Sequence, residues 1–195
     1  MKHYQELILL PQAEVPIYFI WSKVYVQIHL ALTELQAALG TGKVGVAFPE
    51  YRFDAEAQIG HLGRKLRVFA DDAAVLQQLN LAQHLRRYAD YVQLSAVTAV
   101  PAEHGLACYA RVQVKSGAER ATRRLIKRHP ELDYATELAR LQALSVHSVL
   151  PFIQLNSLSS KQTFRLFIAK TAALTAQTGD FGSYGLSNSA TVPDF

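Results

Sequence analysis

Basic side chains concentrated in one short segment, residues 111–128, are the strongest candidates for chemistry in this chain. The segment holds a single acid, Glu119, whereas the whole 195-residue chain has a formal net charge of only +4. Its basic residues are Arg111, Lys115, Arg120, Arg123, Arg124, Lys127 and Arg128. A basic segment this dense on an otherwise balanced protein favours a polyanionic partner such as a nucleic acid.

Most of this charge is predicted to lie on one face of a helix. Ser116-Gly-Ala-Glu119 has the pattern of a capping box, and His129-Pro130 is typical of a helix end. The spacing i, i+3, i+4, i+7, i+8 places five side chains on one stripe: Arg120, Arg123, Arg124, Lys127 and Arg128. The alternative is a solvated helix face, but such a face favours interleaved acids. We therefore expect the arginine stripe to contact phosphates with a steep salt dependence.

Arg111 and Gln113 precede this helix on a predicted strand, residues 108–115. Apolar and polar residues alternate there, which places Arg111 and Gln113 on the same face. An arginine fork matches the edge of guanine, and a glutamine amide matches adenine. The pair is thus a candidate for reading bases, with an ordinary polar strand face as the alternative.

The histidines and serines fall in no familiar catalytic or metal-binding motif. Seven histidines show no HxxxH, HxH or HExxH spacing, and the single cysteine excludes a site built on CxxC pairs. His29 lies beside the apolar stripe of a predicted helix. Ser157, Ser159 and Ser160 lack the GxSxG frame of a nucleophile elbow, and no phosphate-binding glycine motif is present. No metal and no cofactor are expected.

Composition bounds the class of protein. Half of the residues are hydrophobic, so the chain can bury a core as one domain or two small ones. The first apolar run stops at Pro11, too early for a signal peptide or a membrane-spanning helix. The lone Cys108 fits a reducing compartment. We expect a cytoplasmic protein with no membrane partner.

The first half of the chain predicts the order strand, helix, strand, strand, helix, strand. The predicted elements are a strand at 4–10, a helix at 16–39, strands at 44–48 and 65–69, a helix from Asp71 or Asp72 to Leu85, and a strand at 91–100. This order is that of a ferredoxin-like split βαβ unit. Residues 1–98 are therefore predicted to form a ferredoxin-like, RRM-like domain.

The second half of the chain predicts a different set of elements. After the strand at 108–115 and the arginine-rich helix, strands are predicted at 151–155 and 163–169, joined by a serine-rich turn. Gly179, Gly182 and Gly185 predict a looped tail. Residues 99–195 are therefore predicted to form a C-terminal domain with an arginine-rich helix and a small sheet. The fold class is α+β.

Seven short segments, in a specific order and spacing, carry a resemblance to a known family. They are Met1-Lys-His-Tyr4, Gln27-Ile-His29-Leu-Ala-Leu32, Val44-Gly-Val-Ala-Phe-Pro49, Arg111-Val-Gln113-Val-Lys115-Ser116, Glu119-Arg120 through Arg123-Arg124 to Arg128-His129, Phe164-Arg-Leu-Phe-Ile168 and Ser183-Tyr-Gly-Leu-Ser187. In them the chain resembles, from end to end, the CRISPR repeat-processing endoribonucleases of type I-F systems.

The resemblance implies an enzyme that binds the stem-loop of the CRISPR repeat in the precursor transcript and cuts at the 3′ foot of the stem. The RNA carries its own nucleophile, a 2′-hydroxyl, so the reaction needs no metal and leaves a 2′,3′-cyclic phosphate. The family also implies that the protein stays on the mature crRNA with the other subunits of a type I-F surveillance complex.

The resemblance further implies roles for individual residues. His29 matches the catalytic histidine, Ser157 the serine that positions the ribose, and Tyr184 the tyrosine that orders the site. Arg111 and Gln113 would read base pairs at the foot of the stem, and Phe164 would stack on the terminal pair. The remaining expected RNA contacts are Lys115, Arg120, Arg123, Arg124, Lys127, Arg128, His129 and Ser159. Lys127 stands where an arginine is expected and offers a point charge in place of a fork.

Two other functions remain open on the sequence alone. A scaffold subunit that holds a structured RNA without cutting it would need the same basic helix, so the role of His29 decides between the two. A small serine hydrolase using a hydroxyl among residues 157–160 is the other alternative. The missing nucleophile elbow and the position of the positive charge argue against it.

Overall fold

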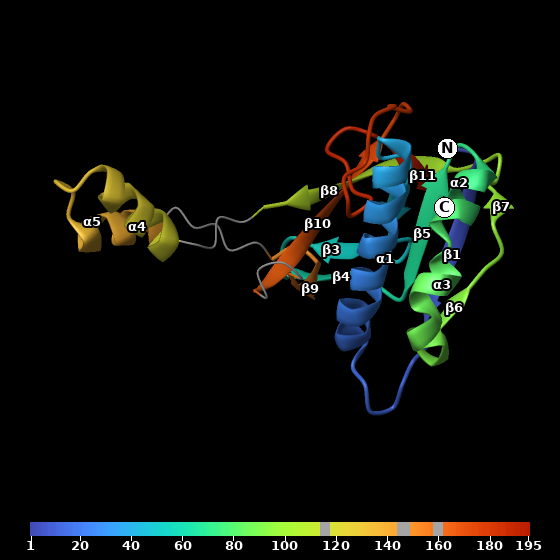
Figure 1. Cartoon of the computed structure of the whole chain (residues 1–195), viewed down its shortest axis with the longest axis horizontal. Helices are drawn as coiled ribbons and strands as arrows, with labels where there is room; N and C mark the ends of the chain where they lie inside the picture. Colours follow the sequence, from blue (N-terminus) through green and yellow to red (C-terminus); the bar gives the residue numbers. More distant parts are fainter. Residues whose placement is uncertain (114–117, 144–148, 158–161) are drawn as a thin grey trace. The chain divides into compact units, whose positions relative to one another are not determined.

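A computed structural model describes residues 1–113, 118–143, 149–157 and 162–195 (Figure 1). The chain forms two compact units, Met1–Arg111 with Leu150–Phe195, and Val112–Val149. This grouping by contacts differs from the division predicted after residue 98, because strands on both sides of that point share one hydrophobic core. Among the described residues, no helix has both the length and the apolar character needed to cross a bilayer.

The larger unit contains an antiparallel sheet with the order β2-β5-β1-β6. Its strands are β1 (His3–Leu9), β2 (Gly45–Ala47), β5 (Lys65–Ala70) and β6 (Val92–Leu94), and β7 (Thr98–Ala99) also pairs with β1. Leu7 lies opposite both Leu66 and Leu94 and is fully buried. The predicted strand at 91–100 is two short strands, because Ser95 Oγ accepts the backbone N–H of Glu6 between them.

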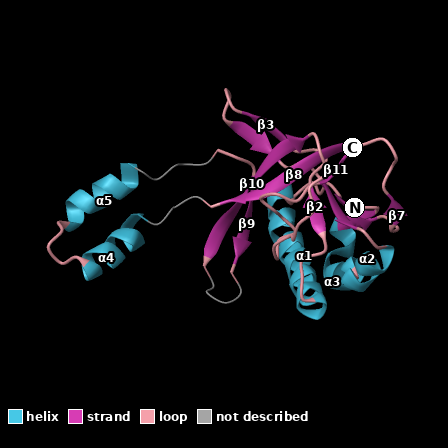
Figure 2. Cartoon of the chain, turned by 90° about the horizontal axis from the view of Figure 1, so that it is seen from above, coloured by secondary structure: helices cyan, strands magenta, loops and turns pink. Residues whose placement is uncertain are grey.

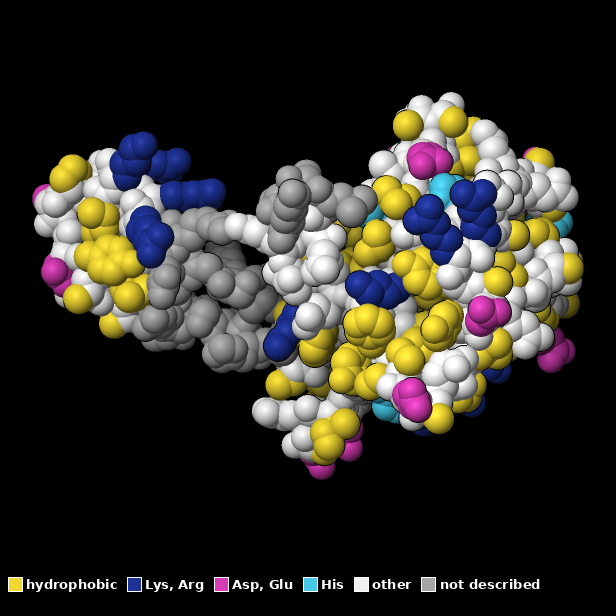
Figure 3. All heavy atoms as spheres, turned by 60° about the horizontal axis from the view of Figure 1, so that its bottom comes forward, with side chains coloured by type: hydrophobic (Ala, Val, Ile, Leu, Met, Phe, Trp, Pro, Cys, Tyr) yellow, Lys and Arg dark blue, Asp and Glu magenta, His cyan; other side chains and the backbone are white. Residues whose placement is uncertain are grey.

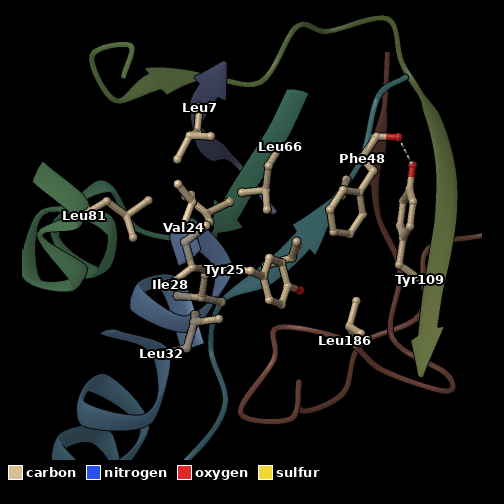
Figure 4. Close-up of a cluster of buried hydrophobic side chains, with 14 of the residues drawn as sticks. Leu7, Val24, Tyr25, Ile28, Leu32, Phe48, Leu66, Leu81, Tyr109 and Leu186 are labelled. Atoms are coloured by element: carbon tan, nitrogen blue, oxygen red, sulfur yellow. Dashed lines mark hydrogen bonds between the residues drawn. The ribbon is translucent and has the colours of Figure 1, made fainter. Parts of the chain in front are cut away.

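The long helix α1 (Ile17–Leu39) agrees with the helix predicted at 16–39. Pro16 caps its start in an extended conformation, and Gly40 ends it with a left-handed φ of 71°. Its buried face includes Val24, Ile28 and Leu32, which pack beside the sheet (Figure 4). Helical spacing of the apolar residues therefore fixes which side of α1 faces the core.

The second predicted helix of this half is interrupted. Asp72 caps α2 (Ala73–Leu79) by accepting the N–H of Ala74 at 2.9 Å. Asn80 then takes a left-handed φ of 44° and separates α2 from α3 (Leu81–Leu85), which is followed by the short 3₁₀ helix η1 (Arg86–Tyr91). Asparagine adopts this conformation more readily than most residues, which explains where the break falls.

A second sheet has the order β11-β8-β10-β9 (Figure 2). Its strands are β8 (Gly105–Val112), β9 (Phe152–Asn156), β10 (Thr163–Ala173) and β11 (Val192–Asp194). The strand predicted at 108–115 is β8, which begins at Gly105 and ends at Val112, so Arg111 lies in the strand and Gln113 directly follows it. Sequence patterns gave no sign of β11 or of the hairpin of β3 (Arg52–Asp54) and β4 (Ile59–His61), whose strands are three residues long.

Aromatic rings join the two sheets through one core (Figure 4). The Phe48 ring lies 6.0 Å from the rings of both Tyr25 and Tyr109, and 5.8 Å from that of Trp21. The Tyr109 hydroxyl donates to the carbonyl oxygen of Phe48 at 3.1 Å. β8 is thus tied to the segment that follows β2.

The smaller unit is a pair of helices, α4 (Ala118–Arg128) and α5 (Tyr134–Ala143). The end of α4 agrees with the stop predicted at His129-Pro130, whereas Ser116 of the predicted capping box lies outside the described residues. Helix α5 was not predicted. Asp133 begins it by accepting the backbone N–H and the hydroxyl of Thr136 at 2.7 and 2.8 Å, and these bonds hold the pKa of this exposed carboxyl below its ordinary value.

The C-terminal loop turns tightly over β2 and α1. Gly185 has φ +68°, its N–H donates to the Gly182 carbonyl, and its own carbonyl accepts the N–H of Val46 at 2.8 Å. A Cβ at position 185 would lie 2.3 Å from a methyl carbon of Val46 and 3.3 Å from one of Leu32. Only glycine fits here without displacing the loop.

We expect Gly185→Ala to lower the free energy of unfolding by about 1 to 3 kcal/mol, because the new methyl group overpacks a filled site. Urea denaturation measures the change. Gly182→Ala is the matched control, since its Cβ would meet only the Leu186 carbonyl oxygen at 3.5 Å. Equal losses in the two variants would contradict the packing argument.

Candidate functional site

A cavity of about 240 Å³ opens in the larger unit beside α1. Its lining residues are Val26, His29, Leu155, Asn156, Ser157, Phe164 and Tyr184. The cavity therefore gathers the three side chains predicted to be catalytic and the ring predicted to stack on RNA. They come from α1, the end of β9, the start of β10 and the C-terminal loop.

His29 has a defined orientation in this cavity. Its Nδ1 lies 2.8 Å from the carbonyl oxygen of Ser183. A carbonyl oxygen can only accept a hydrogen bond, so Nδ1 donates in this pair. In the neutral imidazole the other nitrogen, Nε2, then holds the lone pair. The geometry makes Nε2 the atom of His29 that can accept a proton.

Both the ring and the backbone of Tyr184 contact α1. Their rings stack with centroids 4.3 Å apart and an interplanar angle of 14°. Tyr25, one helical turn before His29, donates its hydroxyl to the Tyr184 carbonyl oxygen at 2.9 Å. Burial raises the pKa of the Tyr25 hydroxyl well above its ordinary value, with the nearby Tyr184 adding to the shift. Tyr25 therefore stays protonated and remains a donor.

The hairpin of β9 and β10 brings Ser157 and Phe164 to the cavity. Asn156 pairs with Thr163 in the strand register, and the Thr163 hydroxyl donates to Asn156 Oδ1 at 2.9 Å. The backbone N–H of Ser157 then donates to the Gln162 carbonyl at 2.9 Å. These bonds fix the strand ends on which Ser157 and Phe164 lie.

Arg111, near the end of β8, joins the aromatic rings of the site. Its guanidinium carbon lies 5.3 Å from the centre of the Tyr184 ring and 5.8 Å from that of Phe164. The two rings themselves are 6.5 Å apart in an edge-to-face arrangement. A cation within about 6 Å of an aromatic face is attracted to it. The site thus has a positive charge close to its rings.

The smaller unit carries the exposed part of the arginine stripe (Figure 3). The exposed residues are Arg123, Arg124, Lys127 and Arg128, and residues 120–130 contain no Asp or Glu. Arg120 lies in α4, and Gln113 belongs to the same unit. Lys115 and Ser159 lie outside the described residues. His129 Nδ1 is 3.2 Å from a Glu131 carboxylate oxygen. The stripe is a surface of one charge sign.

Tyr25 and Asn156 belong to the site but were not predicted from the sequence. A signal existed for Tyr25, which precedes His29 by four residues and so shares its helix face. Nothing in the sequence marks Asn156, because its bond to Thr163 depends on strand register. In the part of the chain that is described, no three His, Cys, Asp or Glu side chains cluster in a way that could hold a metal ion.

Comparisons with known proteins agree over the whole chain. The family described as "CRISPR-associated protein (Cas_Csy4)" matches residues 4–195. The chain is 34% identical to the "CRISPR-associated endonuclease Cas6/Csy4" of Escherichia coli (strain UTI89 / UPEC) and 35% identical to the protein of the same description from Pseudomonas aeruginosa (strain UCBPP-PA14). Both alignments cover 100% of this chain and 100% of the relative.

Two solved structures are similar at a lower level. One is described as "An RAMP protein binding different RNA substrates", with 10% identity, a TM-score of 0.35 and coverage of 98% of this chain and 100% of the other. The second is described as "Characterization of a Cas6-related gene from Pyrococcus furiosus", with 7% identity, a TM-score of 0.34 and coverage of 98% and 99%.

We expect Tyr25→Phe to lower the free energy of unfolding by about 1 to 2 kcal/mol, because the Tyr184 carbonyl loses its donor. Loss of that bond also frees Tyr184 to move against the imidazole. Urea denaturation and the ring nitrogen resonances of His29 measure the two effects.

Tyr109→Phe is the matched control, since it too removes a buried hydroxyl that donates to a backbone carbonyl. It should destabilise the protein without moving the His29 resonances. If Tyr25→Phe left those resonances unchanged, Tyr25 would have only a packing role.

Proposed function

The chain belongs to the CRISPR-associated Csy4 family, and from this membership we propose that it is an endoribonuclease that binds the repeat stem-loop of precursor crRNA and cleaves it at the 3′ foot of the stem. The cavity that contains His29, Ser157, Phe164 and Tyr184 is the observation that supports this proposal most. It combines a proton acceptor and a hydroxyl with aromatic rings, as cleavage beside a base pair requires.

The proposed reaction uses the 2′-hydroxyl of the nucleotide before the cut. His29 Nε2 accepts the hydroxyl proton while the 2′-oxygen bonds to the adjacent phosphorus. The bond from phosphorus to the 5′-oxygen breaks, and that oxygen is protonated as it leaves. The products are a 2′,3′-cyclic phosphate and a 5′-hydroxyl. Positioning of an internal nucleophile supplies much of the rate, so no metal-activated water is required.

The surrounding side chains have supporting roles in this proposal. Tyr184 stacks on His29 and limits the rotation of its ring. Ser157 holds the 2′-oxygen in line for attack. Arg111 lies next to the rings and supplies positive charge near the phosphate, where negative charge develops in the transition state.

RNA recognition is proposed to involve both units. Phe164 stacks on the terminal base pair, and Arg111 and Gln113 read the pairs at the foot of the stem. Arg120, Arg123, Arg124, Lys127, Arg128 and His129 bind the stem from the major groove, with Lys115 and Ser159 as further contacts. An A-form major groove is normally too narrow for side chains, but a short stem that opens at its loop relaxes this limit.

The remaining expectations are part of the same proposal. The antiparallel order β2-β5-β1-β6, with α1 and α2 in the connections, supports a ferredoxin-like arrangement of residues 1–98. Retention of the mature crRNA with other subunits of a type I-F complex, and a cytoplasmic location, stay predictions from the sequence.

We expect His29→Ala to slow cleavage of the repeat hairpin by about 10² to 10⁴-fold, the usual effect of removing a general base. Hairpin affinity should stay within a few fold, because the imidazole acts on a proton and does not anchor the RNA. His104→Ala is the matched control, since His104 Nδ1 also bonds to a backbone carbonyl at 2.8 Å, that of Pro101, but His104 does not line the cavity. Cleavage by His29→Ala at the wild-type rate would contradict the assignment of His29 as the base, whereas absence of cleavage by the wild type would leave the scaffold function.

Two substrate experiments test the nucleophile. Cleavage by the wild type should persist in excess EDTA, and it should stop when the nucleotide before the cut is 2′-deoxy, because that change removes the attacking oxygen. Cleavage of the deoxy substrate, or loss of cleavage in EDTA, would contradict the proposed mechanism.

The arginine stripe should dominate the salt dependence of binding. Changing Arg123 and Arg124 to Gln should reduce the slope of log affinity against log salt by about 1 for each phosphate that is no longer neutralised. Arg140→Gln is the matched control, because Arg140 is an arginine of the same unit that lies in α5 and outside the stripe. An unchanged slope in the double variant would remove the stripe from the RNA interface.

A further inference from the structure

Two aromatic rings at the start of α1 lie on the surface. Tyr18 is 71% exposed and Phe19 is 50% exposed, although both belong to a helix that packs against the core. Lys23 Nζ lies 5.1 Å from the centre of the Phe19 ring. We call Tyr18, Phe19 and Lys23 the α1 aromatic face. The neighbouring Ile20 and Trp21 are buried and supply the packing of this turn against the core, to which the two exposed rings contribute little.

Tyr18 and Phe19 lie on the same sides of α1 as the cavity residues His29 and Val26. Tyr18 precedes His29 by eleven residues, close to three helical turns, so the two share one side of α1. Phe19 precedes Val26, another cavity residue, by seven residues, or two turns. At 1.5 Å per residue, the exposed rings lie about 15 Å along the helix from His29. Figure 1 shows this start of α1 at the end away from the C-terminal loop.

The charge on this part of α1 has one sign. Residues 17–33 contain no Asp or Glu, and Lys23 is the only Lys or Arg among them. Exposed rings on which bases stack, next to a cation that pairs with phosphate, are the combination that binds single-stranded nucleic acid. A purely apolar protein partner would have no use for Lys23.

We propose that the α1 aromatic face binds the single-stranded nucleotides that follow the cut on its 3′ side. This inference rests on the proposed function, because the RNA strand that passes the catalytic cavity must continue beyond it. Bases of the 3′ flank stack on Tyr18 and Phe19, and Lys23 pairs with a flank phosphate. The precursor is thus held on both sides of the scissile phosphate.

Binding of three RNAs by the full chain tests this proposal. One ends at the cut, one carries a 3′ flank of several nucleotides, and one carries an equal 5′ flank; all have 2′-deoxy at the nucleotide before the cut. The 3′ flank should tighten binding by about 5- to 10-fold, and the 5′ flank should not, since stacking of a single base contributes on this scale. Phe19→Ala and Lys23→Gln should each lower that advantage without changing the affinity for the RNA that ends at the cut.

Ile59→Ala and Lys2→Gln are the matched controls, an exposed apolar side chain and an exposed lysine outside α1. Both should keep the flank advantage. An equal advantage in Phe19→Ala and the wild type would overturn the proposal and leave this face to a protein partner. Failure of the wild type to bind the RNA that ends at the cut would instead overturn the proposed function, so the two failures are distinguishable.

Discussion

Tyr25 and His29, one turn apart on α1, donate hydrogen bonds to two consecutive carbonyl oxygens of the C-terminal loop, those of Tyr184 and Ser183. These bonds tie the first helix to a segment near the end of the chain. They set which nitrogen of His29 carries its hydrogen, and they place the Tyr184 ring against the imidazole. The left-handed turn at Gly185 lets the loop approach α1 closely enough for both bonds to form.

The features proposed for binding and for chemistry have different physical characters. The arginine stripe is exposed, has one charge sign and acts through electrostatic attraction that salt screens. The cavity holds hydroxyl groups and stacked rings around one imidazole, and the Arg111 guanidinium lies 5.3 Å from the centre of the Tyr184 ring. In the proposed function the arginine stripe contributes mainly to affinity and His29 mainly to rate, whereas Arg111 contributes to both.

Short-range sequence patterns correctly predicted helix α1 and the end of helix α4. Apolar spacing between Pro16 and Gly40 gave α1, and His129-Pro130 gave the end of α4. The break at Asn80, the short β3–β4 hairpin and the end of β8 at Val112 were not predicted. The hairpin and the end of β8 depend on pairing with distant residues, which overrides the propensity of the segment itself. The break at Asn80 follows from the local left-handed conformation of asparagine.

The arginine stripe can be recognised without the structure, because helical spacing alone puts those residues on one face. Seven short segments of the sequence also pointed to the Csy4 family, which the comparisons confirm. Only the fold shows that His29, Ser157, Phe164 and Tyr184 line one cavity, and that the Tyr25 hydroxyl donates to the Tyr184 carbonyl oxygen. These residues come from elements far apart in the chain. Hydrogen-bond geometry between such elements exists only once strand register and helix packing have brought them together.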